Sequence, residues 1–179
     1  MDIELPKRKN LRLQNYDYSS PNAYFLTICT HDRQPILSDI VGAIHESPLV
    51  ELTEYGKIVN KFINDIPKRY GVKIKRYIIM PDHIHLLILI TANEEFRAIH
   101  ESPLQSWSVV SKIVGYLKMN SSKEIHQKYG NKLLWQRGFY DHIIRNREEY
   151  EKIEKYIYEN PLKWQYNRLK QNKTENSPE

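Results

Sequence analysis

The chain of 179 residues carries a net charge of +5, a hydrophobic fraction of 40% and one cysteine, Cys29. A single cysteine excludes an internal disulfide and a cysteine-based zinc cluster, and the longest apolar run, 86–90, is far too short to span a bilayer. No apolar leader begins the chain, so we expect a cytoplasmic, single-domain protein whose basic balance suits an anionic partner.

Hydrophobic periodicity predicts strands and helices in an alternating order along the chain. The expected segments are an irregular basic arm at 1–20, a strand at 24–30, a short extended piece at 35–37, a helix at 53–66, strands at 72–79 and 83–90, a helix at 106–129, a turn and strand at 133–144, a helix at 147–160, and a polar tail from 165. Thr53 is placed to cap the first helix. Pro67 is expected to end or kink that helix, and Pro161 to stop the last one.

The order β-α-β-β-α-β followed by a helix is typical of the ferredoxin-like split βαβ pattern. We therefore predict an α+β fold with a central antiparallel sheet, helices on one side and a further C-terminal helix. The chain divides into a basic N-terminal arm (1–20), one main domain (21–164) and a polar, flexible tail (165–179).

Two histidines stand one residue apart at the start of the strand expected at 83–90. Alternate side chains of a strand share a face, so His83 and His85 lie together, about 6.5–7 Å apart, while Ile84 and Leu86 point to the other face. Two imidazoles at this spacing can converge on one cation. They can also be core or edge histidines satisfied by hydrogen bonds, and the strand alone leaves both interpretations open.

The last predicted helix, 147–160, carries a second pair of polar residues. At about 100° per residue, Tyr156 and Asn160 lie one turn apart at the margin of its apolar stripe, whereas Tyr158 points about 200° away from Tyr156. The tyrosine hydroxyl can therefore face a site, with the Asn160 amide as third ligand beside the two histidines. Alternatively, Tyr156 packs and Asn160 caps the helix before the following proline.

The heptapeptide Ala-Ile-His-Glu-Ser-Pro-Leu occurs twice, at 43–49 and 98–104. The two copies fall in non-equivalent predicted loops, so they do not indicate a duplicated domain. We interpret them as one short segment inserted twice where surface loops tolerate additions, and we do not expect His45 or His100 to be ligands.

Several short motifs, spread in order over roughly residues 8–164, give the chain a family resemblance. They are Arg12-Leu13 with Tyr16-Asp17-Tyr18, Tyr24-Phe25-Leu26-Thr27, Met80-Pro81-Asp82-His83-Ile84-His85, Trp135-Gln136, Tyr140-Asp141-His142-Ile143-Ile144-Arg145-Asn146, and Tyr156-Ile157-Tyr158-Glu159-Asn160-Pro161. Together they resemble the HUH single-tyrosine transposases, most closely their REP-associated tyrosine transposase branch. The paired histidines combined with the Tyr-x-x-x-Asn-Pro helix make the match specific.

The resemblance implies that His83 and His85 are metal ligands and that Tyr156 is the nucleophile. Asn160 takes the place of the third ligand, which is glutamine in insertion-sequence relatives; its shorter side chain favours a water-bridged contact. Asp82 stands where relatives often carry asparagine. The implied cofactor is Mg²⁺ or Mn²⁺, although imidazole ligands on general grounds favour zinc or other transition ions. The implied partner is single-stranded or hairpin DNA, and no association with a membrane is expected. The protein would act as a monomer or a homodimer.

The expected reaction of the main domain is metal-dependent cleavage and rejoining of single-stranded DNA at palindromic repeats. A 5′-phosphotyrosine at Tyr156 would store the bond energy, so that a DNA 3′-hydroxyl can reverse the step without ATP. Basic and aromatic residues are expected to contact the substrate. They are Lys7, Arg8, Lys9 and Arg12 in the arm, and Trp135, Arg137, Tyr140, His142, Arg145, Arg147 and Lys152 later in the chain. A solvated basic face is the alternative for each group.

Other functions stay open at this point. A protein derived from a transposase can bind DNA hairpins after losing catalysis, and a covalent protein–DNA adduct would distinguish the two. A metallohydrolase of small phosphoesters would use the histidines with carboxylates, but it leaves Tyr156 and Asn160 unexplained. Plasmid replication initiators share the chemistry, and the REP-type flanking motifs disfavour them.

Overall fold

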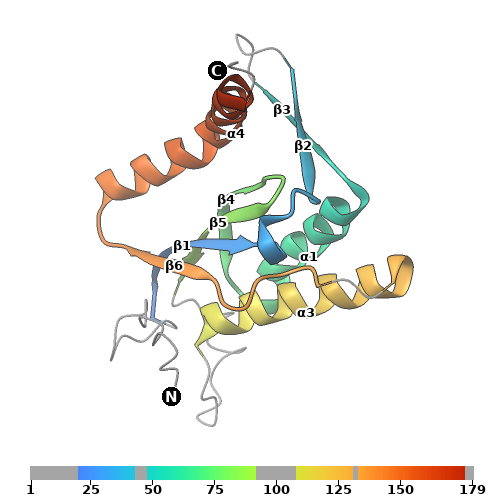
Figure 1. Ribbon diagram of the computed structural model, residues 1–179. Coiled ribbons are helices and arrows are strands. Elements are labelled where there is room, and N and C mark those ends of the chain that lie inside the picture. Colours follow the sequence, from blue (N-terminus) through green and yellow to red (C-terminus); the bar gives the residue numbers. More distant parts are fainter. Residues whose placement is uncertain (1–19, 43–47, 92–107, 131–132, 176–179) are drawn as a thin grey trace, which may run out of the picture.

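The main sheet of the protein has four antiparallel strands in the order β4-β5-β1-β6 (Figure 1). The computed structural model describes residues 20–42, 48–91, 108–130 and 133–175. The four strands are β1 (Asn22–Cys29), β4 (Lys73–Ile79), β5 (His83–Ile90) and β6 (Tyr140–Ile144). Helix α1 connects β1 to β4, and α3 connects β5 to β6, which is the connectivity of a split βαβ unit. The predicted α+β fold is confirmed.

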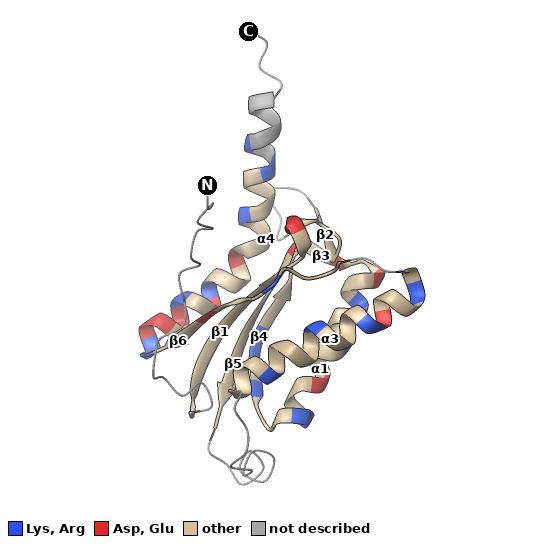
Figure 2. Cartoon of the chain, turned by 60° about the horizontal axis from the view of Figure 1, so that its bottom comes forward, with Lys and Arg blue, Asp and Glu red and all other residues tan. Residues whose placement is uncertain are grey.

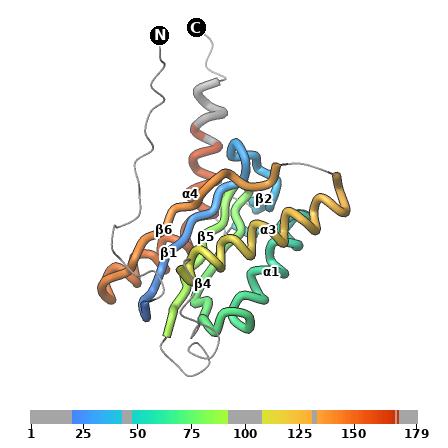
Figure 3. Tube along the Cα trace, turned by 90° about the horizontal axis from the view of Figure 1, so that it is seen from below, coloured from blue at the N-terminus to red at the C-terminus, as the bar shows by residue number. Residues whose placement is uncertain are grey.

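Helices α1 (Glu54–Tyr70) and α3 (Val109–Tyr129) cover one face of this sheet, and α4 (Arg147–Glu175) covers the other (Figures 2 and 3). The main core lies under α1 and α3. The strands supply it with fully buried side chains from alternate positions: Tyr24, Leu26 and Ile28 of β1, and Ile84, Leu86, Ile88 and Ile90 of β5. Burial of each such side chain is worth about 1.5–3 kcal/mol.

A smaller apolar cluster holds α4 against the opposite face. Ile157 of α4 packs there with Phe25, Leu87 and Ile144 of the sheet. Because side chains two residues apart share a face, His83 and His85 lie on the same side as Leu87. The histidines therefore face α4 rather than the main core.

Helix α1 begins where the sequence predicts and ends later. The Thr53 hydroxyl accepts a hydrogen bond from the N–H of Gly56 at 3.1 Å, which confirms the predicted cap. The helix continues past Pro67 to Tyr70 and ends at Gly71, which has a φ of +60°. Pro67 does not end the helix, because it sits in the last turn, where its missing N–H costs a single intrahelical bond.

Helix α4 differs most from its predicted extent, because it runs through Pro161 to Glu175. The prediction that Pro161 stops the helix is wrong. An interior proline costs about 3 kcal/mol. Residues beyond it still make tertiary contacts: the Gln165 side chain donates to the carbonyl of Gly42 at 2.9 Å, a bond worth about 1 kcal/mol. The helix bends along its length, as expected for an internal proline (Figure 1).

A two-stranded hairpin follows β1 and was not predicted. Its strands are β2 (Ser38–Val41) and β3 (Leu49–Leu52). The sequence pattern indicated only an extended piece at 35–37, just before β2. The hairpin is attached to the main sheet where the Ser38 hydroxyl donates to the carbonyl of Ile79 at 2.8 Å.

Some predicted features fall outside the described residues. They are the arm at 1–19, most of the first heptapeptide copy (43–47), the whole second copy (98–104) and the end of the tail (176–179). The division into arm, domain and tail stays a prediction. Among the helices that the structure describes, none combines the length and apolar character needed to cross a bilayer.

Candidate active site

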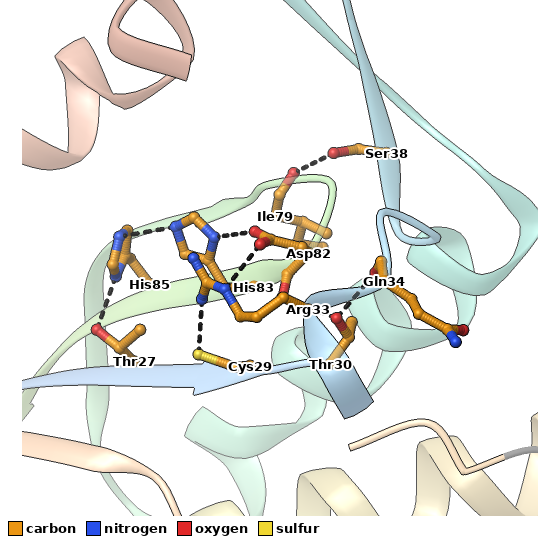
Figure 4. Close-up of polar contacts among 10 residues, drawn as sticks. All are labelled: Thr27, Cys29, Thr30, Arg33, Gln34, Ser38, Ile79, Asp82, His83 and His85. Carbon is orange, nitrogen blue, oxygen red and sulfur yellow. Dashed lines mark hydrogen bonds and ion pairs between the residues drawn. The ribbon is translucent and has the colours of Figure 1, made fainter. Parts of the chain in front are cut away.

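The two histidines of β5 meet on the sheet face that α4 covers (Figure 4). Nε2 of His83 lies 3.1 Å from Nε2 of His85. On the other side of each ring, Nδ1 of His83 lies 2.5 Å from a carboxylate oxygen of Asp82, and Nδ1 of His85 lies 2.9 Å from the hydroxyl of Thr27. Both imidazoles are buried. Each ring is thus anchored at Nδ1, and the two Nε2 atoms converge.

This arrangement fits one cation held by both Nε2 atoms, and the same distance also allows a hydrogen bond between the two rings. Metal–nitrogen bonds of about 2.1 Å, at tetrahedral or octahedral angles, place two nitrogen ligands roughly 3.0–3.4 Å apart. The observed 3.1 Å falls in that range. Because the Asp82 carboxylate only accepts hydrogen bonds, His83 carries its proton on Nδ1 and keeps the lone pair of Nε2 for a ligand.

The charge state of His85 also suits a ligand. Burial lowers the pKa of His85 to about 3; electrostatic interactions with the neighbouring His83 and Arg33 side chains act in the same direction. The ring is therefore neutral near neutral pH, as metal binding requires. No group of three His, Cys, Asp or Glu within the described part of the chain could hold a metal. A third protein ligand would have to be another oxygen donor.

Asn160 is such a donor, and Tyr156 lies one turn before it on α4. Asn160 is buried and lines the same cavity as the two histidines. The Tyr156 residue is 40% exposed; the centroid of its ring lies 5.3 Å from that of His85 and 6.0 Å from that of Phe25, which the ring meets nearly edge-on. By contrast, Tyr158 is 68% exposed and does not line the cavity. The structure thus brings together all four residues that the sequence singled out.

The cavity around these residues has a volume of about 1010 Å³ and opens between the sheet, β2 and α4. A further group of cavity-lining residues was not predicted from the sequence, and most of them come from the part of α4 beyond Pro161. They are Arg33, Lys163, Trp164, Asn167 and Arg168. Lys163 places its ammonium 5.1 Å from the centroid of the Tyr156 ring and 3.1 Å from a carboxylate oxygen of Glu159, with which it forms an ion pair. Continuing the helical spacing of Tyr156 and Asn160 past the proline would have found the four residues on α4.

The three residues between 135 and 140 that were predicted to contact DNA lie in three different environments. Tyr140 lines the cavity and is exposed. Arg137 is exposed beside a separate hollow between α3 and the segment that precedes β6. Trp135 is only 9% exposed, belongs to the main core and donates its indole N–H to the Ser121 hydroxyl at 2.9 Å. This burial gives no support to base stacking on Trp135.

The remaining predicted contacts lie away from the cavity or are paired with carboxylates. Arg145 and Arg147 flank a third hollow at the end of β1 that is opposite to the histidines. His142 pairs with Glu149, Arg147 with Glu151, and Lys152 with Glu148. Arg8 and Arg12 are outside the described residues. A role in DNA binding stays a prediction for each of them.

Comparison with known proteins assigns the family. The family model described as "Transposase IS200 like" matches residues 23–160, a stretch that includes both histidines, Tyr156 and Asn160. Two proteins of Haemophilus influenzae are similar over most of their length. One, described as uncharacterized, is 28% identical over 173 residues, covering 90% of this chain and 92% of its own. The other, provisionally described as a REP-associated tyrosine transposase, is 26% identical over 166 residues, covering 86% and 79%.

A solved structure agrees with the fold. The structure of a REP-associated tyrosine transposase bound to a REP hairpin matches with a TM-score of 0.57 at 19% identity, over 85% of this chain and 73% of that one. At this identity the match supports the architecture of the sheet and its helices. The family model, which spans well over half of the chain, gives the stronger result: the protein belongs to the IS200-like transposase family.

Proposed function

We propose that the protein cuts and rejoins single-stranded DNA through a covalent 5′-phosphotyrosine at Tyr156. The observation that carries this proposal is the position of the Tyr156 ring, 5.3 Å from His85, in one cavity with His83 and Asn160. A metallohydrolase of small phosphoesters would have no use for a tyrosine at this point. All four residues meet in the cavity of a single chain, so we propose that the site is complete within a monomer.

The proposed step is a transesterification. The Tyr156 hydroxyl attacks a DNA phosphorus, the bond from phosphorus to the 3′ oxygen breaks, and the phenolic proton ends on the departing 3′-hydroxyl. The number of phosphoester bonds is unchanged, so attack by a DNA 3′-hydroxyl on the phosphotyrosine reverses the step. Phenolate is a better leaving group than an alkoxide, which keeps the adduct reactive.

The residues around Tyr156 hold the reacting groups. Phe25 supports the tyrosine ring edge-on, and the Lys163 ammonium near its face provides positive charge where a phenolate develops. His83 and His85, with Asn160 directly or through water, would hold Mg²⁺ or Mn²⁺. The bound cation would neutralise a non-bridging phosphate oxygen and stabilise the departing 3′ oxygen.

The substrate proposed here is a palindromic repeat presented as a DNA hairpin with a single-stranded flank. Two observations support it: a relative of similar length is described as REP-associated, and a protein of the same fold was solved with a REP hairpin. The cavity in this chain carries Arg33, Lys163 and Arg168 on its walls, which suits a phosphate backbone.

The adduct assay tests the proposal directly. Single-stranded oligonucleotides that span palindromic repeats beside the gene are labelled at the 3′ end and incubated with protein and Mn²⁺ or Mg²⁺. We expect the label to migrate with the protein on a denaturing gel, because the 5′-phosphate of the labelled fragment is joined to tyrosine. Tyr156→Phe removes the adduct, and the matched control Tyr158→Phe retains it.

Two results would contradict the assignment. An adduct that persists in Tyr156→Phe places the nucleophile elsewhere. Tight binding of the hairpin by the wild-type protein, without any adduct under either cation, identifies a DNA-binding protein that has lost the chemistry.

A further inference from the structure

Arg33 holds an unusual position beside the paired histidines. It follows β1 in a short turn in which both Asp32 and Arg33 have positive φ, 50° and 56°. Residues with a Cβ avoid this conformation unless surrounding contacts impose it. The contacts are strong here: Thr30 binds the carbonyl of Asp82 through both its N–H and its hydroxyl, each at 2.9 Å. The turn is thus fixed to the segment that leads into β5.

The guanidinium of Arg33 is held in place from two sides (Figure 4). Nε lies 2.8 Å from one carboxylate oxygen of Asp82, and Nη1 donates to the sulfur of Cys29 at 2.8 Å. The other carboxylate oxygen of Asp82 receives the bond from His83. Asp82 therefore links the arginine to the histidine pair through a single buried carboxylate.

Within the part of the chain that the structure describes, these contacts leave some N–H groups of the guanidinium for a ligand. An arginine side chain has five N–H donors, and the contacts to Asp82 and Cys29 use two of them. The side chain is 48% exposed and lines the cavity that contains Tyr156. An arginine whose only role was to orient Asp82 would not need to face the cavity. A planar fork of donors fixed at its base is instead suited to bind the oxygens of a phosphate.

The acidic groups near Arg33 do not satisfy it fully. Asp82 is shared with His83, and the exposed Asp32 pairs with His31 at 3.1 Å. Asp39 of β2 also lines the cavity, and no ion pair joins it to Arg33 among the described residues. A positive charge shared in this way can still attract an anion from solvent.

We propose that Arg33 forms a phosphate subsite of the cavity, in which its remaining N–H groups bind a non-bridging oxygen of one backbone phosphate of the DNA strand. Asp82 and Cys29 orient the guanidinium, so that the strand is held at a fixed distance from Tyr156. The inference rests on the proposed function only in taking single-stranded DNA as the ligand. It does not require that the protein cleave DNA.

Chemical neutralisation of single phosphates tests this subsite. In a Tyr156→Phe background, which prevents cleavage, fluorescence anisotropy measures affinity for a hairpin oligonucleotide with a single-stranded flank. One linkage at a time is replaced by an uncharged methylphosphonate. We expect one linkage in the flank to weaken binding about tenfold when neutralised. Arg33→Gln should weaken binding of unmodified DNA by a similar factor. In this variant, neutralising that one linkage should no longer weaken binding, while the effects of the other linkages stay as they are in the parent protein.

The matched control is Arg69→Gln, the same change on an exposed arginine of α1 on the opposite face of the sheet. It should keep both the affinity and the sensitive linkage. Circular dichroism and thermal unfolding verify that each variant is folded. If Arg33→Gln does not fold, Arg33→Lys serves instead. It should bind unmodified DNA more weakly than the parent protein does, and the two proteins should bind equally well to DNA that is neutralised at the sensitive linkage.

The proposal is overturned if Arg33→Gln, or Arg33→Lys in its place, weakens binding equally for every methylphosphonate position. It is also overturned if Arg33→Gln leaves affinity unchanged. The two proposals fail separately. A wild-type protein without adduct but with the Arg33-dependent linkage would refute the phosphotyrosine chemistry and keep the subsite, whereas an adduct without such a linkage would refute the subsite alone.

Discussion

His83 and His85 approach each other through their Nε2 atoms at 3.1 Å, while their Nδ1 atoms are bound to groups outside β5 that differ for the two rings. Thr27, which anchors His85, is its direct partner across the β1–β5 pairing. Asp82, which anchors His83, lies in the turn between β4 and β5 and is itself bound by Arg33. The orientation of the pair therefore depends on the sheet register and on two turns.

Removal of one histidine should severely weaken cation binding. We expect His85→Ala to weaken Mn²⁺ binding at least 100-fold, because a single imidazole and an amide oxygen make a poor site. Thr27→Val, which removes the anchor of the ring, should weaken it about 10–100-fold. Isothermal titration calorimetry measures both. The control is His142→Ala, which removes a histidine of the same sheet that pairs with Glu149. This variant should bind Mn²⁺ as the wild type does, and an equal loss of Mn²⁺ affinity in all three variants would contradict the proposed site.

The burial of His85 predicts a pH dependence of stability. Its pKa is about 3 in the folded protein, against an ordinary value of 6.5. Between these values the unfolded chain binds a proton that the folded chain does not, so the free energy of unfolding falls as the pH is lowered from about 6.5, by up to about 1.4 kcal/mol per pH unit. Urea unfolding with a chelator at about pH 7, 6 and 5 measures this slope. His85→Asn should flatten it, and an unchanged slope would show that His85 is not the group responsible.

Gly56 should be indispensable although it lies in a helix. A Cβ at this position would stand 2.0 Å from the carbonyl oxygen of Leu37. Gly56→Ala should therefore destabilise the fold by about 2–3 kcal/mol or more, despite the higher helix propensity of alanine. A Cβ added at Gly115 in α3 would meet no atom within 4 Å, so Gly115→Ala should instead stabilise by up to about 1 kcal/mol. Thermal unfolding should show opposite shifts of Tm, and shifts of the same sign would refute this account.

The cationic residues on the distal part of α4 should contribute to DNA affinity through charge. Lys163 and Arg168 line the cavity. We expect the double substitution Lys163→Gln and Arg168→Gln to reduce the slope of log K against log salt by about 1.4, since each phosphate contact with single-stranded DNA contributes about 0.7. Anisotropy titrations from low to physiological salt, in the Tyr156→Phe background, measure the slope. The same change at Lys68 and Arg69 of α1 should leave it unaltered; an equal effect there would indicate only a loss of net charge.

Much of the architecture follows from local patterns in the sequence. The strand predicted at 24–30 is present as β1, and its alternate residues Tyr24, Leu26 and Ile28 lie in the main core. The cap at Thr53 and the strand at His83–Ile90 were predicted because side-chain periodicity and capping depend on residues close in the chain. The same periodicity placed Tyr156 and Asn160 one turn apart, on the side of α4 that lines the cavity.

The errors have a shared physical origin in long-range contacts. Proline disfavours a helix by its local geometry, yet α4 continues through Pro161, and residues beyond it contact the hairpin, as Gln165 does at Gly42. Strand β2 was misplaced because its four residues are held in a strand by their pairing with β3. Trp135 is placed among the DNA contacts by its basic neighbours in sequence, and only its packing against α3 shows that it is part of the main core; its role in DNA binding stays a prediction.

Backbone geometry repeats every two residues in a strand and about every 3.6 in a helix, so the sequence predicts that His83 and His85 share a face of one strand and that Tyr156 and Asn160 share a face of one helix. Long-range packing then brings these two faces together across one cavity. It also turns the Nε2 atoms toward each other, through Thr27 and Asp82, and places Arg33 beside the same space. Strand register and the docking of α4 set those relationships, and both depend on contacts between residues far apart in the chain.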